Sequence, residues 1–192
     1  CENNSTSYPT VTIGNQIWMQ KNLNVCTYRN GDEIPQVQDP NQWTNLTTGA
    51  WCYYQNDTAN GIVYGKLYNW YAVNDPRGLA PAGYHVPSDG EWTSLINFLG
   101  GESVAAGKMR ATSLWNSPNA GATNSSGFTG LPGGFRPGAG PFDMIGSIAF
   151  WWSSSQSFDN FSWYYYLEND YGDASRSYLN KSCGFSVRCI KD

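Results

Sequence analysis

The chain has 192 residues, enough for one domain with a substantial hydrophobic core. Aromatic residues make up 16% and charged residues only 14%, against about 25% charged residues in an ordinary soluble domain. With 21 glycines and 10 prolines, this composition favours a loop-rich fold built on large rings and excludes a helical bundle. A net charge of −4 without a Lys or Arg cluster excludes a typical nucleic-acid-binding surface, and a single histidine excludes His-pair metal sites.

The first part of the chain predicts a hairpin and a short helix. Apolar and polar residues alternate over residues 10–18 on either side of Gly14-Asn15, which is typical of a β-hairpin. Residues 66–73 carry apolar side chains at positions i, i+3 and i+4, so we expect a short amphipathic helix there.

The clearest local pattern begins at Ser88. Ser88 and Glu91 form a capping box, in which each side chain accepts a backbone N–H of the other residue. The helix is expected to end at about Leu99, because two glycines follow. A further helix is predicted over residues 103–110. The apolar stripe of the first helix is expected to lie in the core and consists of Trp92, Leu95, Ile96 and Leu99.

Beyond residue 115 the amino-acid composition changes. Asn, Ser, Gly and Pro dominate residues 116–140, which predicts a long ordered loop region anchored by aromatic side chains. Short strands are then expected over residues 149–154, 163–167 and 184–190.

The five cysteines are Cys1, Cys26, Cys52, Cys183 and Cys189. An odd number in a chain with the character of a secreted protein leaves one thiol to explain. Cys1 stands first and precedes a polar stretch, which resembles the start of a mature bacterial lipoprotein. We therefore expect lipidation at Cys1, a tether over residues 1–7 and a single domain over residues 8–192. The alternative is a sequence start that falls at a cysteine by chance.

The other four cysteines allow three disulfide connectivities. Cys183 and Cys189 flank an alternating segment, and six residues of strand span ~20 Å, whereas a disulfide joins Cα atoms within ~7 Å. This argues against Cys183–Cys189 and its complement, Cys26–Cys52. Cys26–Cys183 with Cys52–Cys189 is the preferred pairing, and the crossed pairing stays open. Four reduced thiols in a cytoplasmic core are the remaining alternative.

Several separated motifs carry a resemblance to a known family. They are residues 18–25 (WMQKNLNV), 64–73 (YGKLYNWYAV), 83–88 (GYHVPS), 91–92 (EW), 127–128 (GF), 131–136 (LPGGFR), 150–154 (FWWSS) and 184–189 (GFSVRC). In these motifs the chain resembles the Fibrobacter succinogenes major paralogous domain, a family of bacterial secreted and surface proteins largely without assigned biochemistry. The order of the motifs also resembles, more remotely, the formylglycine-generating branch of C-type lectin-like folds. The resemblance implies an α+β, C-type lectin-like fold with short helices, small antiparallel sheets and long ordered loops.

That branch contains an oxidase as well as many binding domains, so the fold leaves the activity open. By resemblance, the oxidase needs a copper-binding cysteine pair upstream of the terminal Gly-Phe motif. Here Cys183 directly precedes that motif and Cys189 lies within the expected strand, so the two thiols cannot share a metal ion.

His85 with Asp89 and Glu91 is another catalytic candidate. The two acids are explained by the helix start, and we expect a structural role for His85.

Calcium is a separate possibility because C-type lectins often bind sugars through it. Glu168, Asp170 and Asp173 are weak candidates for its ligands, since calcium takes six to eight oxygens. The Glu-Pro-Asn or Gln-Pro-Asp sugar signature is absent. A solvated turn is the simpler interpretation, and no cofactor is expected.

The aromatic residues are the remaining candidates for function. They are continuous over residues 151–152 and 163–166, so these strands present rings on both faces. We expect a core position for Trp70, Trp92, Trp151 and Phe185. Exposed rings beside polar residues suit carbohydrate or protein recognition. The candidate ligand-binding residues are Tyr164, Tyr166, Asn169, Tyr171 and Tyr178.

The sequence therefore predicts a non-enzymatic adhesion or binding domain that recognises a polysaccharide or a protein outside the cell. We expect an extracytoplasmic location, as a bacterial outer-membrane or cell-surface lipoprotein, with membrane contact only through a lipid anchor and no nucleic-acid partner. Two alternatives stay open: a cysteine-dependent oxidase of the formylglycine-generating type and a purely structural surface module.

Overall fold

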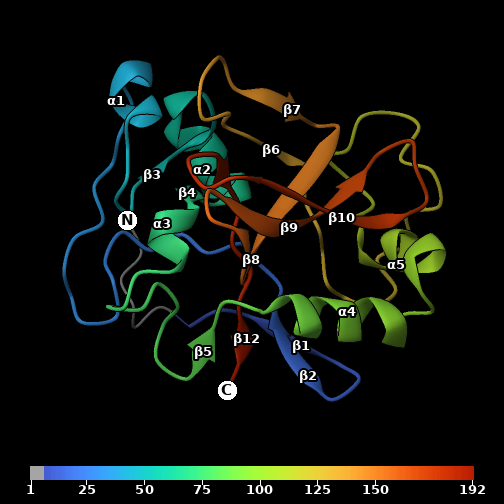
Figure 1. Ribbon diagram of the computed structural model, residues 1–192. Coiled ribbons are helices and arrows are strands. Elements are labelled where there is room, and N and C mark those ends of the chain that lie inside the picture. The colour runs from blue at the N-terminus through green and yellow to red at the C-terminus, as the bar shows by residue number, and fades with distance from the viewer. Residues whose placement is uncertain (1–6) are drawn as a thin grey trace.

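The computed structural model describes residues 7–192 (Figure 1). These residues form an α+β fold of short helices and small, mainly antiparallel sheets, as the sequence predicts. The strands, in sheet order, lie as β1-β2-β12-β5, as β10-β9-β8-β6-β7 and as β11-β4-β3. The elements are β1 (Thr10–Ile13), β2 (Gln16–Met19), α1 (Pro40–Thr44), β3 (Trp51–Cys52), the 3₁₀ turn η1 (Tyr54–Asn56), α2 (Thr58–Tyr64), β4 (Leu67–Asn69), α3 (Trp70–Val73), β5 (Tyr84–His85), α4 (Asp89–Phe98), α5 (Glu102–Met109), β6 (Gly133–Phe135), β7 (Asp143–Ile145), β8 (Ile148–Phe158), β9 (Phe161–Glu168), β10 (Ala174–Asn180), β11 (Gly184–Phe185) and β12 (Ile190–Lys191).

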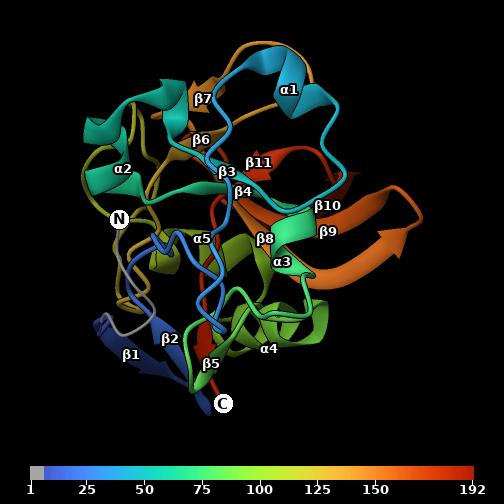
Figure 2. The same ribbon diagram turned by 90° about the vertical axis from the view of Figure 1, so that its left-hand side faces the viewer.

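The N-terminal hairpin is confirmed. β1 and β2 pair antiparallel across a two-residue turn, in which Gly14 takes φ +63°, a value that suits glycine. The last strand, β12, lies inside the same sheet, because Ile190 pairs with Trp18 of β2 on one side and with His85 of β5 on the other. The two ends of the domain therefore share one sheet, which Figure 2 shows beside the C-terminus.

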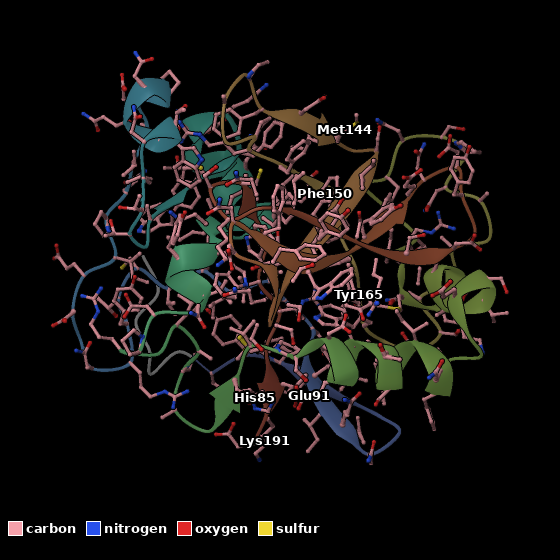
Figure 3. The ribbon with its side chains drawn as sticks, viewed as in Figure 1. His85, Glu91, Met144, Phe150, Tyr165 and Lys191 are labelled. Carbon is pink, nitrogen blue, oxygen red and sulfur yellow. The ribbon has the colours of Figure 1, made fainter. Side chains whose placement is uncertain are left out.

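The five-stranded sheet carries aromatic side chains on both faces. On one face Trp151 and Tyr165 pack against Trp92 of α4, and Figure 3 shows Tyr165 pointing toward that helix. On the other face Trp152 packs against Phe185, with ring centroids 4.4 Å apart. The four rings expected in the core are buried, namely Trp70, Trp92, Trp151 and Phe185.

The helix predictions after residue 85 are confirmed. α4 begins with the capping box: Ser88 Oγ accepts the Glu91 N–H at 3.3 Å, and Glu91 Oε2 accepts the Ser88 N–H at 2.8 Å. α5 follows as predicted, and residues 116–140 form loops apart from β6. None of the described helices has the length and apolar character needed to cross a membrane.

The single helix predicted over residues 66–73 is wrong. Its first half is strand β4, and only the second half is helix α3. All three β4 residues are buried, so their apolar pattern reflects a strand that is buried on both faces and paired along both edges, with β3 and β11. Asn69 starts α3 because its Oδ1 accepts the Ala72 N–H at 3.1 Å.

The C-terminal strands differ from the prediction in extent. The strands expected over residues 149–154 and 163–167 are longer, and β10 was missed because its sequence, ASRSYLN, has few apolar residues. Residues 184–190 do not form one strand. They begin as β11 and end as β12, which belong to different sheets.

Neither predicted disulfide pairing forms. Cys26 is disulfide-bonded, but Cys52, Cys183 and Cys189 are buried free thiols. Cys52 also lies in a different core cluster from Cys183 and Cys189. The strand geometry on which the prediction rested is also absent between residues 186 and 189. Cys1, the expected lipidation site, lies outside the described residues.

The buried charged side chains of the described chain are all cations. No Asp or Glu is among them, and each cation lies over an aromatic ring, at 4.3 to 5.8 Å from the ring centroid. The five are Lys66, Arg110, Arg136, Lys181 and Arg188. Backbone carbonyls supply further acceptors, so rings and carbonyl oxygens replace carboxylates as the partners of these charges.

Candidate binding site

A groove of about 330 Å³ opens at the loop that joins β9 to β10. We call it the tyrosine groove; it is lined by Tyr166, Glu168, Tyr171, Asp173 and Ser175. Its volume lies at the lower end of the range of about 300–1,000 Å³ that small-molecule sites occupy. The groove therefore has room for a small ligand or for one or two units of a polymer.

The two tyrosines of the groove differ in how firmly they are held. Tyr166 lies on β9 opposite Ser175 of β10, and its ring stacks on Phe150 with centroids 6.1 Å apart and 27° between the planes. Tyr171 lies in the loop and is 63% exposed. One ring is thus fixed by the sheet, while the other is available to a ligand.

Arg110 holds the loop from beneath. This fully buried residue follows α5, and its Nη1 donates to the carbonyl oxygens of Glu168 and Tyr171, the latter at 3.1 Å. Its Nη2 donates to the carbonyl oxygen of Ala120. One guanidinium thus fixes the backbone at two groove residues, which keeps the groove open without a ligand. Sequence reasoning missed Arg110 because it lies nearly sixty residues from the loop it supports.

The groove is acidic. Burial raises the pKa of Glu168, and the nearby charge of Asp170 raises it further. No Lys or Arg lines the groove, so its carboxylates face the ligand space as hydrogen-bond acceptors. A ligand with hydroxyl groups can donate to Glu168 and Asp173 while its apolar face meets the tyrosine rings.

The predicted ligand-binding residues separate into those inside the groove and those outside it. Tyr166 and Tyr171 line it together with two of the acids. Tyr164 packs into the core against Phe185, with ring centroids 4.8 Å apart. Asn169 Nδ2 donates to the carbonyl oxygens of residues 116 and 117, so this side chain holds the neighbouring loop.

The weak calcium candidates do not form a metal-binding cluster. Among the described residues, no group of three or more His, Cys, Asp or Glu side chains is placed to hold a metal ion. Glu168 and Asp173 line the groove, but Asp170 does not. These candidates are therefore not supported as a calcium site, which needs six to eight oxygens together.

Tyr178 belongs to a separate exposed cluster, which we call the aromatic patch. The patch consists of Phe158, Phe161, Trp163 and Tyr178. The Tyr178 ring meets the other three edge to face, at centroid distances of 5.4, 5.9 and 5.6 Å. Sequence reasoning found Tyr178 but missed its neighbours, because their assembly depends on the register of β8, β9 and β10.

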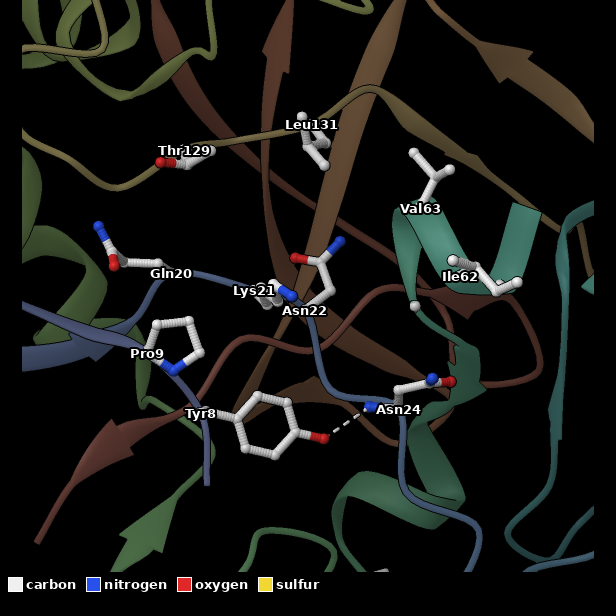
Figure 4. Close-up of a pocket in the computed structure, with 12 residues that line it drawn as sticks. Tyr8, Pro9, Gln20, Lys21, Asn22, Asn24, Ile62, Val63, Thr129 and Leu131 are labelled. Carbon is white, nitrogen blue, oxygen red and sulfur yellow. Dashed lines mark hydrogen bonds between the residues drawn. The ribbon is translucent and has the colours of Figure 1, made fainter. Parts of the chain in front are cut away.

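A second opening, of about 320 Å³, lies between the N-terminal segment and α2 (Figure 4). Its polar side chains already hold other parts of the chain. Gln20 Nε2 donates to the carbonyl oxygen of Gly127, and Asn22 Nδ2 donates to that of Tyr64. Asn24 Oδ1 accepts from Lys66 Nζ at 2.8 Å. Because these groups maintain the fold, the tyrosine groove is the better candidate for binding.

His85 lies between two carboxylates at the bottom of the molecule in Figure 3. Its Nε2 is 2.8 Å from Glu91 Oε1, and its Nδ1 is 2.8 Å from Asp192 Oδ1. Burial lowers the pKa of His85, but its hydrogen bonds to Glu91 and Asp192 raise it more, and the net pKa is raised. Through these two contacts, His85 links the start of α4 to Asp192.

A family model described as the Fibrobacter succinogenes major domain matches residues 11–191. The chain belongs to this family. Neither the curated proteins nor the solved structures gave a significant match. The motifs that carry the Fibrobacter succinogenes major domain resemblance include Lys66, Arg136 and Arg188, three of the five buried cations. The tyrosine groove lies between two of these motifs, in residues 166–175.

Proposed function

We propose that this Fibrobacter succinogenes major domain is a non-enzymatic, C-type lectin-like module that binds a neutral glycan in the tyrosine groove. The observation that carries the proposal is the groove itself, which combines two tyrosine rings with two carboxylates and a serine hydroxyl. Rings stack on the apolar faces of sugars, and carboxylates accept hydrogen bonds from sugar hydroxyls. The anchoring of the loop by Arg110 supports a site formed before the ligand arrives.

The charge distribution supports a neutral ligand over an acidic one. Five of the eleven Lys and Arg side chains are buried, whereas no Asp or Glu is buried in the described chain. The surface is therefore more acidic than the net charge of −4 indicates. Uronic acids, sulfated glycans and nucleic acids meet repulsion at such a surface, and most strongly at a groove lined by Glu168 and Asp173.

A location outside the cytoplasm belongs to the same proposal. It is supported by the disulfide at Cys26, since disulfides persist in oxidising compartments and are rare in the cytosol. The three free thiols are deeply buried, and burial raises the pKa of Cys52 and Cys183 to about 11 and that of Cys189 to about 12. Such thiols are inert toward oxidants, so their reduced state is compatible with this location.

The test is calorimetric titration with soluble neutral oligosaccharides of several linkages, beside an acidic oligosaccharide of equal length. Short ligands are chosen so that multivalency does not contribute. We expect binding to a neutral member of the panel and a loss of affinity of about tenfold, ~1.4 kcal/mol, in Tyr171→Ala. Tyr178→Ala is the matched control, because it removes an exposed tyrosine of the same hairpin outside the groove.

Two outcomes contradict the proposal. One is the absence of binding to every neutral oligosaccharide. The other is equal loss of affinity in the two tyrosine variants, which moves the site out of the groove. Preference for the acidic oligosaccharide contradicts the charge argument in particular.

A further inference from the structure

Strand β10 lies at the edge of the five-stranded sheet. In the described part of the chain its only strand partner is β9, so the other edge of β10 offers unpaired backbone groups (Figure 1). Natural edge strands are usually protected by Pro, Lys, a bulge or a short length. β10 has seven residues, ASRSYLN, without Pro, Lys or an acidic residue, and its pairing with β9 runs without a register shift. Its single charge, Arg176, is held over the Trp163 ring, and α5 packs against the strand. This edge is open to another strand.

The aromatic patch lies at the C-terminal end of β10. Tyr178 is 46% exposed, and beside it Phe158 and Phe161 are 59% and 37% exposed, so the aromatic patch is a cluster of large apolar side chains in contact with solvent. Tyr178 lies opposite Trp163 in the strand register, which places the patch on the face of the sheet that also carries Tyr165 and α4.

The other end of β10 carries a hollow on the same face. A groove of about 280 Å³, which we call the helix groove, lies between α4 and the sheet and includes Ile96, Tyr165 and Arg176. Arg176 already lies over one aromatic ring, with its Cζ 4.2 Å from the Trp163 centroid, and its Nη1 contacts the Asp89 carboxylate. Thr93, Asn97 and Glu102 complete the lining, so the hollow is mainly polar and offers a ring two apolar contacts, Ile96 and Tyr165, beside the guanidinium.

We propose that two copies of this chain pair antiparallel through β10 about a two-fold axis at Ser177. In this register Arg176 of each copy lies opposite Tyr178 of the other. The aromatic patch of each copy then meets the helix groove of the other, and this contact occurs twice in the dimer. An isologous interface requires such self-complementarity, with residue i contacting j and j contacting i. The absence of carboxylates from β10 lets two otherwise acidic surfaces approach along this strip.

The register is tested by cysteine cross-linking of the full chain. Ser177→Cys places two thiols directly opposite each other at the axis, where antiparallel Cα atoms lie about 4.5–5.5 Å apart, within disulfide range. Ser175→Cys is the matched control, since Ser175 is equally half-buried on the same face of β10 as Ser177. In the proposed register it lies opposite Leu179 of the second copy, so two thiols at position 175 do not meet. Under mild oxidation we expect a covalent dimer from Ser177→Cys and none from Ser175→Cys. Equal cross-linking of both variants, or none of either, overturns the proposal.

A second experiment tests the pairing of Arg176 with Tyr178. Sedimentation velocity over a range of concentrations is expected to show a monomer–dimer equilibrium for the unaltered chain. Tyr178→Arg places two guanidinium groups opposite each other and should raise the dimer dissociation constant about tenfold or more. The exchange Arg176→Tyr with Tyr178→Arg restores opposite partners and should recover dimerisation. A chain that stays monomeric at every concentration, or an exchange variant that does not recover, contradicts the proposal.

Discussion

At the scale of single residues, the protein depends on cations that are buried without acids. Arg188 is the clearest case. Its Nη1 donates to the carbonyl oxygens of Met19 at 3.0 Å and Phe128 at 2.6 Å, and its Nε and Nη2 both donate to Asn22 Oδ1. Burial lowers the pKa of Arg188 to about 9, so it remains charged at neutral pH. One side chain thus joins β2, the loop at Phe128 and the C-terminal segment.

Replacement of Arg188 by Met should therefore destabilise the domain strongly. The methionine fills much of the space but leaves the carbonyls of Met19 and Phe128 buried without the donor they have in the unaltered protein, while Asn22 Oδ1 keeps only the Trp151 indole N–H. Each unsatisfied group costs about 1–3 kcal/mol, so we expect a loss of about 3 kcal/mol or more in the free energy of unfolding. Urea denaturation measures it, with Lys191→Met as the control at an exposed cation. A loss no larger than in the control contradicts this account of the buried cations.

His85 predicts a pH dependence of stability. Its folded-state pKa lies above the ordinary value of about 6.5, so the protonated form is favoured in the folded chain. The stability that follows is complete below the unfolded-state pKa and is lost as the pH rises through the folded-state pKa. As the pH rises above about 6.5, Tm of the unaltered protein should fall relative to that of His85→Gln. Because the chain has one histidine, parallel Tm curves of the two proteins contradict the prediction.

At the scale of elements, the start of α4 is the best-defined contribution of local sequence. Ser88→Ala removes the oxygen that accepts the Glu91 N–H, and an N-cap of this kind is worth about 1 kcal/mol. Ser94→Ala is the matched control, since Ser94 is an exposed serine of the same helix whose hydroxyl donates to the Gly90 carbonyl. Denaturation of both variants should show a loss of about 1 kcal/mol for Ser88→Ala and a few tenths for Ser94→Ala. Equal losses contradict the assignment.

The elements that the sequence predicts well are those with a local cause. The hairpin at Gly14 and the helix at Ser88 are each determined by side chains within a few residues. Strand β4 was mistaken for helix because it is enclosed on both faces, so its apolar pattern carries no strand period. β10 was missed for the opposite reason, since its polar sequence becomes a strand only by pairing with β9.

The candidate site was predictable only in part, for the same physical reason. Tyr166 and Tyr171 stand out as rings in polar surroundings, and the structure places both in the groove. Tyr164 looks identical in sequence and lies on the same face of β9 as Tyr166, but its ring packs against Phe185, which the chain brings in from β11. The contribution of Arg110 and the disulfide state of Cys26 depend on contacts between distant segments, which no local pattern contains.

At the scale of the whole molecule, the high aromatic content and the low content of charged residues have a common cause, because aromatic rings take the place of carboxylates in the interior. Rings fill both faces of the central sheet, and they also surround the buried cations in place of carboxylates. The interior therefore takes up positive charge, and the surface keeps the negative charge. This distribution sets the proposed preference for a neutral ligand and makes β10, which has no acid, the strip where two copies can meet.

The most direct test of the central claim is an NMR titration of the ¹⁵N-labelled protein with a neutral oligosaccharide selected by calorimetry. We expect the amide shifts to concentrate in residues 166–175, around the tyrosine groove, and to be strongly reduced in Tyr171→Ala at the same ligand concentration. Shifts that instead concentrate around the opening between the N-terminal segment and α2, or that persist unchanged in Tyr171→Ala, contradict the claim.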